Sequence, residues 1–401
     1  MTKLKKRMYL GAGALLLVIL LLGGWLFYFL VLGPRIAIRH AEEFSFRRMT
    51  VAQLEEPGMY RFYFVTNRRP KSDEGPLKER LSNERHEQLK FGYFDTKIEP
   101  SLGLGMLVNP SDWLLNEEIE VTDIQLSQRA NFVTALQERV QASPHKSLLI
   151  LLHGFREGFA SALQKTAFFG HVLDINAPIL VFDWPGNQGS TLSGYRRAQQ
   201  VARASGADLA KTIAVTVDEI RPEQVWIVAN SMGGEVVIKA FKSLFESGVL
   251  RGTETVIEDV VLTAPDVGRD ELNERFKREI SALARNLTVY VSSNDQALLM
   301  SRIVNRQKRG GESTLDIANP DQFEEALATL ELTDDNDGVI TLVDVTPVNR
   351  TRNFHNFSLE TPEFFDDLFL RLSNQRDPNS RPEYKVRTNK GNVYWILTRA
   401  R

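Results

Sequence analysis

The chain has 401 residues, of which 43% are hydrophobic and 25% are charged. This composition is typical of a folded protein and excludes disordered and collagen-like chains. Its 49 Lys and Arg nearly balance 51 Asp and Glu, so the net charge of −2 gives no sign of a nucleic-acid-binding protein, and the absence of cysteine excludes disulfides, thiolate metal sites and a cysteine nucleophile.

A long apolar segment near the N-terminus predicts a membrane anchor. Residues 8–32 carry no charged side chain, and as a helix they would extend roughly 37 Å, more than the ~30 Å hydrocarbon core of a bilayer. Four basic side chains lie in the tail 1–7, so the positive-inside rule predicts a cytoplasmic N-terminus. The sequence therefore predicts a single-pass membrane protein whose remaining residues lie on the non-cytoplasmic side, periplasmic or extracellular.

A cleavable signal peptide is the alternative for this segment. The apolar core of a signal peptide usually has about 7–15 residues and ends in small residues. Here the segment ends in large side chains, from Trp25 to Leu30. We therefore expect residues 8–32 to remain as an anchor, residues 33–58 to form a linker and residues 59–401 to form the folded domain.

The folded domain is expected to be of the α/β class. Strand-like runs occur at 60–65, 91–94 and 119–126, and the charged stretch 68–90 is typical of a solvated loop. Beyond about residue 128, segments with helical spacing alternate with short apolar runs. These runs lie at 148–152, 178–182, 224–228, 256–262, 286–291 and 339–345. The alternation predicts a mostly parallel sheet with helices on both faces, and a ligand site beyond the carboxyl ends of the strands.

A serine follows the strand expected at 224–228. Residues 229–234 read Ala-Asn-Ser-Met-Gly-Gly, and a helical pattern comes next. This matches the small-x-Ser-x-Gly elbow that lifts a reactive serine above a sheet, with Ala229 where Gly is usual. The turn would also place Ser231 at a helix N-terminus, which favours developing negative charge. Ser231 is the predicted nucleophile, and an unreactive N-cap serine is the alternative.

Two backbone N–H groups would form the oxyanion hole of such an enzyme. One comes from the residue after the nucleophile, here Met232, and the other from the loop after an earlier strand. His153, Gly154 and Phe155 directly follow the strand 148–152. We expect the N–H of Phe155 to be the second donor, Gly154 to permit close approach, and His153 to orient the loop rather than act as a base.

The order of residues along the chain selects the base. Enzymes with this elbow carry the nucleophile, the acid and the histidine in that order, and of the six histidines only His355 follows Ser231. A surface-loop histidine is the alternative. Two carboxylates could orient the imidazole and stabilise its cation. Asp295 follows the strand 286–291 and is favoured by its position, and Asp266, which follows the preceding strand, is the alternative acid.

Five motifs together resemble a bacterial family of α/β hydrolases of uncharacterised function, broadly esterase- and lipase-like. They read LLHGF at 151–155, FDWPG at 182–186, ANSMG at 229–233, APDV at 264–267 and YVSSND at 290–295. The resemblance covers about residues 60–360. It implies the α/β-hydrolase fold and a catalytic triad of Ser231, Asp295 and His355.

Three further residues concern the expected substrate pocket. Asn230 and Arg156 stand where the family more often has His and Asn, and both would border the pocket. Trp184 follows a strand and could form a wall of the pocket, or could simply pack within a Pro/Gly turn. The resemblance therefore carries over the scaffold but no substrate preference.

The sequence thus predicts a membrane-anchored serine hydrolase that cleaves carboxylic esters through an acyl-enzyme on Ser231. A thioesterase, peptidase or acyltransferase with the same triad is an alternative, as is a non-catalytic envelope scaffold that retains the fold. The expected partners are an acyl ester, either a small molecule or a lipid, and the membrane, with no nucleic acid. No metal or organic cofactor is expected, because the triad and oxyanion hole supply the whole mechanism. The sequence indicates no oligomeric state.

Overall fold

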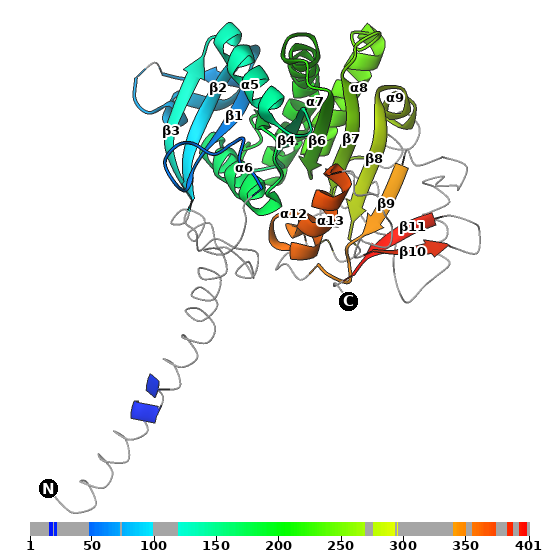
Figure 1. The fold of residues 1–401 in the computed structure, drawn as a ribbon. Coiled ribbons are helices and arrows are strands. Elements are labelled where there is room, and N and C mark those ends of the chain that lie inside the picture. The colour runs from blue at the N-terminus through cyan, green and yellow to red at the C-terminus, as the bar shows by residue number, and fades with distance from the viewer. Residues whose placement is uncertain are drawn as a thin grey trace, which may run out of the picture.

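A single eleven-stranded sheet forms the centre of the described structure, in the order β10-β11-β9-β8-β7-β6-β4-β5-β1-β2-β3 (Figure 1). The computed structural model describes residues 16–18, 20–21, 48–72, 74–98, 119–268, 276–292, 295, 340–349, 355–373, 383–387 and 393–398. The strands are β1 Met59–Pro70, β2 Leu81–Ile98, β3 Ile119–Ser127, β4 Ser147–Leu152, β5 Ile179–Asp183, β6 Gln224–Asn230, β7 Val256–Thr263, β8 Ala284–Val291, β9 Ile340–Asp344, β10 Glu383–Arg387 and β11 Val393–Leu397.

The central strands are parallel and almost entirely apolar. In β4 all six residues are buried, with Leu148 and Ile150 on one face and Leu149 and Leu151 on the other. Neighbouring strands are parallel from β1 through β5, β4, β6, β7, β8 and β9 to β11. Strands β2, β3 and β10 pair antiparallel towards the two ends of the sheet. The carboxyl ends of the parallel strands therefore meet along one edge.

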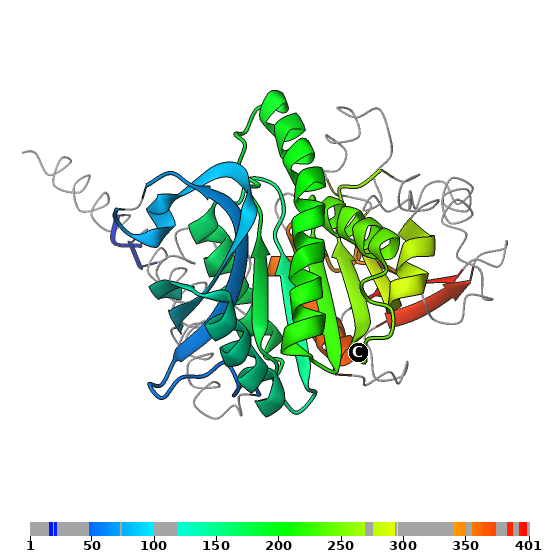
Figure 2. The same ribbon diagram turned by 90° about the horizontal axis from the view of Figure 1, so that it is seen from above.

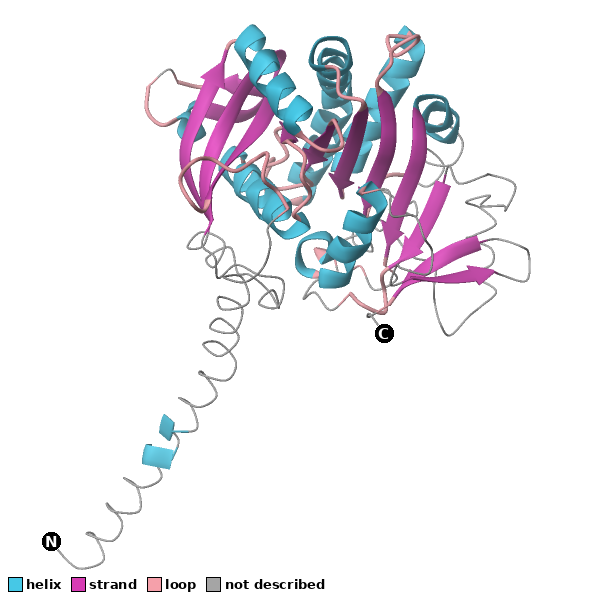
Figure 3. Cartoon of the chain, viewed as in Figure 1, coloured by secondary structure: helices cyan, strands magenta, loops and turns pink. Residues whose placement is uncertain are grey.

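Helices cover both faces of this sheet. They are α3 Leu77–Arg80, α5 Arg129–Ala142, α6 Phe159–Leu173, α7 Leu192–Val215, the π-helical turn η3 Thr216–Ile220, α8 Gly233–Ser247, α9 Lys277–Leu283, α12 Phe357–Glu360 and α13 Pro362–Leu372. Helices α5, α7, α8 and α9 share one hydrophobic core with the sheet, and α6, α12 and α13 share the other. Figure 2 shows α7 and α8 in front of the sheet, and Figure 3 shows the strands between the helical layers. The predicted mostly parallel sheet with helices on both faces is confirmed.

The charged segment 68–90, expected to be a solvated loop, is mostly strand. Strand β1 continues to Pro70 and β2 begins at Leu81, and the two pair with Arg68 opposite Arg85. An antiparallel ribbon satisfies its own backbone hydrogen bonds and can keep charged side chains on a solvated face. A run of charges was therefore no argument against a strand, and the loop interpretation was wrong.

The last part of the predicted linker 33–58 packs on the domain. Met49 is 2% exposed. The backbone N–H groups of residues 48 and 49 donate to the carboxylate of Asp174, and those of residues 50 and 51 donate to the side-chain oxygen of Asn176. These contacts fix residues 48–51 beside the C-terminal end of α6.

The predicted anchor lies largely outside the described residues. Of residues 8–32, the structure describes 16–18 and 20–21, which are helical and exposed. Across the described part of the chain, no helix combines the length and the apolar character needed to cross a membrane.

Candidate active site

Ser231 lies at a sharp turn between β6 and α8. Its φ is +53°, a left-handed value that a residue with a side chain rarely adopts. Its N–H donates to the carbonyl of Thr263 at 2.8 Å, and its own carbonyl accepts from the N–H of Gly234 at 3.0 Å and of Asp266 at 3.1 Å. These three hydrogen bonds hold the strained turn in place.

The turn requires small neighbours because backbone segments approach it closely. A Cβ on Gly233 would lie 2.8 Å from the carbonyl oxygen of His153, and a Cβ on Gly154 would lie 3.0 Å from the Cβ of Ser231. Both contacts are tighter than side chains normally allow. The packing of the loop 153–158 against the turn thus explains why Gly154 and Gly233 are glycines.

Three residues from three separate loops form one hydrogen-bonded line. The Oγ of Ser231 lies 2.9 Å from Nε2 of His355, and Nδ1 of His355 lies 2.7 Å from Oδ2 of Asp295. Ser231 follows β6, Asp295 lies beyond β8 and His355 beyond β9, so the sheet brings them together at its carboxyl edge. Both contacts are satisfied when Nδ1 carries the proton and Nε2 accepts from the serine hydroxyl.

The surroundings of His355 favour its protonated form. Burial lowers the pKa of this histidine, but the hydrogen bond from its ring to Asp295 and the negative charges of Asp295 and Asp266 outweigh burial, so its pKa is raised above 6.5. The histidine is therefore suited to accept a proton from a neighbouring hydroxyl and to hold it.

Of the two candidate acids, Asp295 has a carboxylate oxygen 2.7 Å from Nδ1 of the His355 ring. Asp266 instead accepts a hydrogen bond of 2.6 Å from the hydroxyl of Tyr195 in α7. The negative charge of Asp266 also contributes to raising the pKa of His355. The geometry thus distinguishes a hydrogen-bonded carboxylate from one that acts through space.

The residues expected to form the oxyanion hole lie next to the nucleophile in the chain and in the loop that packs against it. Met232 is fully buried and directly follows Ser231 at the start of α8. Phe155 follows Gly154, and its ring packs edge-to-face on Tyr195 at 5.6 Å. Because Gly154 approaches Ser231 closely, the segments that carry Phe155 and Met232 meet at the nucleophile.

The remaining predicted pocket residues are held in the structure around the site. The side-chain oxygen of Asn230 accepts hydrogen bonds from Thr263 at 3.0 Å and from Ser358 at 3.3 Å. Trp184 is fully buried, and its indole N–H donates to the carbonyl of His153 at 3.0 Å. Trp184 therefore packs under the loop, as in the second alternative that the sequence left open, and does not form an exposed wall.

Both ring nitrogens of His153 have oxygen partners. Nε2 lies 3.2 Å from Oδ1 of Asp183, and Nδ1 lies 3.0 Å from the carbonyl oxygen of Gly154. The ring also stacks on Trp184, with the centroids 5.5 Å apart and the planes 6° from parallel. His153 is thus fixed between the loop that follows β4 and the end of β5.

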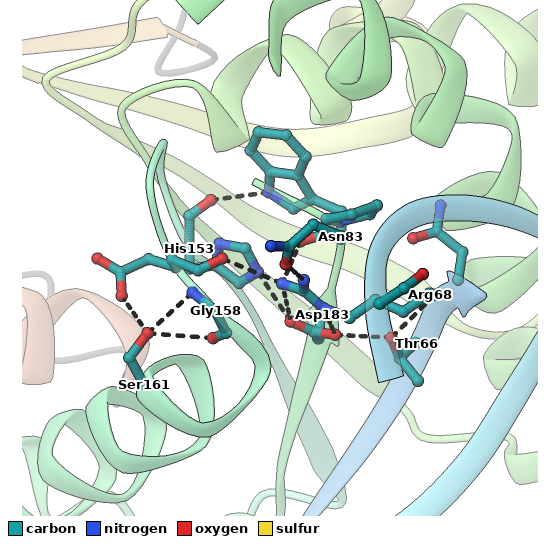
Figure 4. Close-up of polar contacts among 12 residues, drawn as sticks. Thr66, Arg68, Asn83, His153, Gly158, Ser161 and Asp183 are labelled. Atoms are coloured by element: carbon teal, nitrogen blue, oxygen red, sulfur yellow. Dashed lines mark hydrogen bonds and ion pairs between the residues drawn. The ribbon is translucent and has the colours of Figure 1, made fainter. Parts of the chain in front are cut away.

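A buried ion pair under this loop was missed by the sequence reasoning (Figure 4). Arg68 in β1 is 1% exposed and donates through Nε and Nη2 to both carboxylate oxygens of Asp183, at 2.7 and 3.0 Å. Burial raises the pKa of Asp183, but the Arg68 charge and the hydrogen bonds from His153 and Arg68 outweigh burial and lower it to about 2. Arg68 lies in a charged run whose composition indicated a loop. The one signal in the sequence was Asp183, a charged residue directly after a predicted buried strand, which would need a cationic partner.

Comparison with protein families matches residues 128–369 to the family described as alpha/beta hydrolase of unknown function (DUF900). None of the proteins with curated descriptions matches the chain. Similar solved structures include an uncharacterized protein from Bacillus cereus ATCC 10987, at 16% identity over 63% of this chain and 70% of that chain, with a TM-score of 0.35. Another, described as a "putative hydrolase" from Agrobacterium vitis S4, has 13% identity over 73% and 95% of the two chains and a TM-score of 0.31. The family match covers more than half of the sequence, and the chain therefore belongs to the alpha/beta hydrolases of unknown function.

Proposed function

We propose that the protein is a serine hydrolase that cleaves carboxylic esters through an acyl-enzyme on Ser231. The observation that carries this proposal is the hydrogen-bonded line from Ser231 through His355 to Asp295. A serine hydroxyl is a weak nucleophile on its own, and a histidine base within hydrogen-bonding distance is what activates it. The orientation of the histidine by a buried carboxylate completes the arrangement.

The first half of the reaction forms the acyl-enzyme. The Oγ of Ser231 attacks the ester carbonyl carbon while its proton moves to Nε2 of His355, and the charge of Asp295 stabilises the resulting imidazolium. The carbonyl oxygen becomes an oxyanion, which the N–H groups of Phe155 and Met232 would stabilise together with the N-terminus of α8. His355 then gives its proton to the departing alcohol.

The second half releases the acid. His355 takes a proton from a water molecule, whose oxygen attacks the acyl carbon, and the same oxyanion donors act again. The bond from the acyl carbon to the Oγ of Ser231 breaks, and the proton on His355 returns to that oxygen. The cycle consumes one water molecule and returns Ser231 and His355 to their starting protonation states.

The proposal predicts that Ser231→Ala abolishes turnover of a p-nitrophenyl acyl ester. The expected loss is about 10⁴-fold or more, because the variant has no nucleophile. The same substitution should prevent labelling by a fluorophosphonate probe, which reacts with activated serines. Unchanged turnover in the Ser231→Ala variant would contradict the proposal.

A matched control is Ser143→Ala. Ser143 is buried like Ser231, but it lies at the end of α5, where its hydroxyl donates to the carbonyl of Asn176. This variant should retain both turnover and labelling. A loss of activity common to both variants would indicate a folding defect rather than a missing nucleophile.

A further inference from the structure

The loop 153–158 carries the proposed oxyanion donor of Phe155, and its two ends are tied to one buried side chain. At the start of the loop, the His153 ring contacts Asp183, which Arg68 holds by two hydrogen bonds. Towards its end, the carbonyl of Glu157 accepts directly from Nη2 of Arg68 at 3.0 Å. The guanidinium thus contacts one end of the loop directly and the other through Asp183 (Figure 4).

A second set of contacts joins Arg68 to the loop through Trp184. Nη2 of Arg68 donates to the carbonyl of Trp184 at 2.9 Å, and the indole N–H of Trp184 donates to the carbonyl of His153. Two residues further along, the carbonyl of Gly186 accepts from the N–H of Arg156 at 3.0 Å. The turn after β5 therefore bonds to the loop in two places while Arg68 fixes the turn itself.

The whole arrangement is buried, so its geometry is tightly determined. Arg68 is 1% exposed and Asp183 is fully buried. The remaining donor of the guanidinium, Nη1, contacts the side-chain oxygen of Asn83 at 2.8 Å, and the hydroxyl of Thr66 donates to Asp183 at 2.6 Å. The planar guanidinium of arginine can donate to several acceptors at once in fixed directions. The ammonium of lysine is a single point of charge and cannot replace this set of contacts.

We infer that Arg68 is a positioning residue that holds the loop 153–158 in place for the oxyanion hole. The inference rests on the proposed function, since it assigns Arg68 a role in aligning the N–H of Phe155. Arg68 does not touch substrate and acts through the loop. It also lies in β1, before the part of the chain that matches the family, so the site depends on a residue that the matched region lacks.

The experiment compares Arg68→Lys with a matched control, Arg61→Lys. Arg61 lies on the same strand and makes the same two-pronged contact, through Nε and Nη2, with Asp95 at 2.7 Å for each bond. Its partner Asp95 is in β2, opposite it in the antiparallel ladder. Each variant keeps a positive charge and removes one guanidinium fork, but only Arg68→Lys removes contacts to the loop.

Two readouts are needed, and one does not depend on activity. Amide hydrogen exchange in peptides covering residues 153–158 should be faster in Arg68→Lys than in the wild type or Arg61→Lys. With a p-nitrophenyl ester, kcat should fall by about 10- to 100-fold in Arg68→Lys while KM stays unchanged, because displaced donors weaken the transition state rather than substrate binding. Arg61→Lys should keep the wild-type kcat.

A second variant covers the case in which Arg68→Lys does not fold. Trp184→Phe keeps an aromatic ring beside His153 and removes the indole N–H that bonds to the His153 carbonyl. It should show the same faster exchange of residues 153–158 and a reduced kcat. Wild-type exchange and kcat in this variant, with Arg68→Lys unfolded, would overturn the inference.

The outcomes separate this inference from the proposed function. An active wild type, with Arg68→Lys no different from Arg61→Lys in loop exchange or in kcat, overturns the role of Arg68. So does a loss that falls on KM alone, because misplaced oxyanion donors lower kcat. The wild type could hydrolyse no ester while Arg68→Lys still speeds amide exchange in residues 153–158. In that case the proposed reaction is wrong, but the role of Arg68 in fixing the loop is supported.

Discussion

The φ of +53° at Ser231 shows how one residue can be placed against its own conformational preference. A residue with a side chain in this region costs about 1–3 kcal/mol, and such strain persists only where the surroundings over-determine it. Here the hydrogen bonds to Thr263, Gly234 and Asp266 and the close approach of Gly154 do so. In this conformation the hydroxyl of Ser231 lies 2.9 Å from Nε2 of His355.

Sequence order alone could select Ser231 and His355, because the elbow motif is local and only one histidine follows it. The choice between Asp295 and Asp266 could not be made in this way, because both follow parallel strands and both reach the same edge. Arg68 could not be found at all, since its partner Asp183 is brought beside it only when β1 pairs with β5. Separation along the chain is not what decides this, because Ser231 and His355 are 124 residues apart. A residue can be predicted where a local motif and the order of residues along the chain identify it, and Arg68 has neither.

Substitution of the two acids should separate their roles. Asp295→Asn should lower kcat by about 10³- to 10⁴-fold, because an amide cannot hold the Nδ1–H tautomer of His355 or stabilise its cation. Asp266→Asn should retain most of the activity, because this carboxylate acts on His355 through space. The measurement is kcat for a p-nitrophenyl ester. A larger loss in Asp266→Asn than in Asp295→Asn would identify Asp266 as the acid.

The pH profile gives an independent check on the same pair. His355 must be neutral to accept the serine proton, so kcat/KM should fall as the pH drops through its pKa, which lies above 6.5. Because the charge of Asp266 raises this pKa, Asp266→Asn should move the acidic limb to lower pH. An unmoved limb would show that Asp266 does not act on the base.

At the scale of elements, apolar runs predicted the central strands well. The run 148–152 corresponds to β4, and 224–228 lies within β6, because strands buried on both faces must be continuously apolar. The β1–β2 ribbon was harder to predict. In its charged part, 68–90, Arg68 pairs with Arg85 and Pro70 with Leu81. The strand character of this part comes from backbone pairing and leaves no apolar pattern in the sequence.

A buried charge cluster joins three elements at the C-terminal part of the chain. Arg371 in α13 donates through Nε to Asp367 at 2.8 Å and to the hydroxyl of Tyr290 in β8 at 3.0 Å, and through Nη2 to Glu383 in β10. The Tyr290 hydroxyl also donates to Asp367. Burial and the neighbouring carboxylates raise the pKa of Tyr290 well above 10, so the tyrosine remains a donor. The cluster therefore joins α13 to two strands of the sheet, β8 and β10.

Arg371→Met should destabilise the fold by about 3–5 kcal/mol, because it leaves two buried carboxylates without their cation. The measurement is the free energy of unfolding from urea titration. A matched control is Lys242→Met in α8, whose ion pair with Glu246 has the same spacing of four residues but is exposed. That substitution should cost less than about 1 kcal/mol. Equal losses in the two variants would contradict the role given to the buried cluster.

For the whole molecule, the sheet extends beyond the region that matches the family. Residues 128–369 contain β4 to β9, but β1, β2 and β3 precede them and β10 and β11 follow. Strand β1 pairs in parallel with β5, placing Thr66 opposite Asp183. The sequence predicted one α/β domain over residues 59–401. It did not show which strands lie at the two ends of the sheet, because strand order depends on long-range pairing. The anchor predicted for residues 8–32 stays a prediction.

The position of β1 in the sheet leads us to predict how two N-terminally truncated chains behave. A chain that begins at residue 48 and runs to residue 401 should unfold in one cooperative transition and turn over ester as fast as the full chain, because it retains every described strand and Arg68. A chain of residues 128–401 should not fold stably. It would expose the β5 edge, remove the fully buried Phe62 and Phe64 from one hydrophobic core, and leave Asp183 without its cation.

Thermal unfolding followed by circular dichroism, together with kcat for a p-nitrophenyl ester, tests both truncated chains. Thermal unfolding reports loss of the fold, and kcat reports loss of the alignment of the loop 153–158 with Ser231. If the shorter chain unfolds cooperatively but has a reduced kcat, β1 keeps only its positioning role through Arg68. If the shorter chain equals the longer one in both unfolding and turnover, both roles are contradicted, because the sheet and the loop 153–158 would then be held without β1.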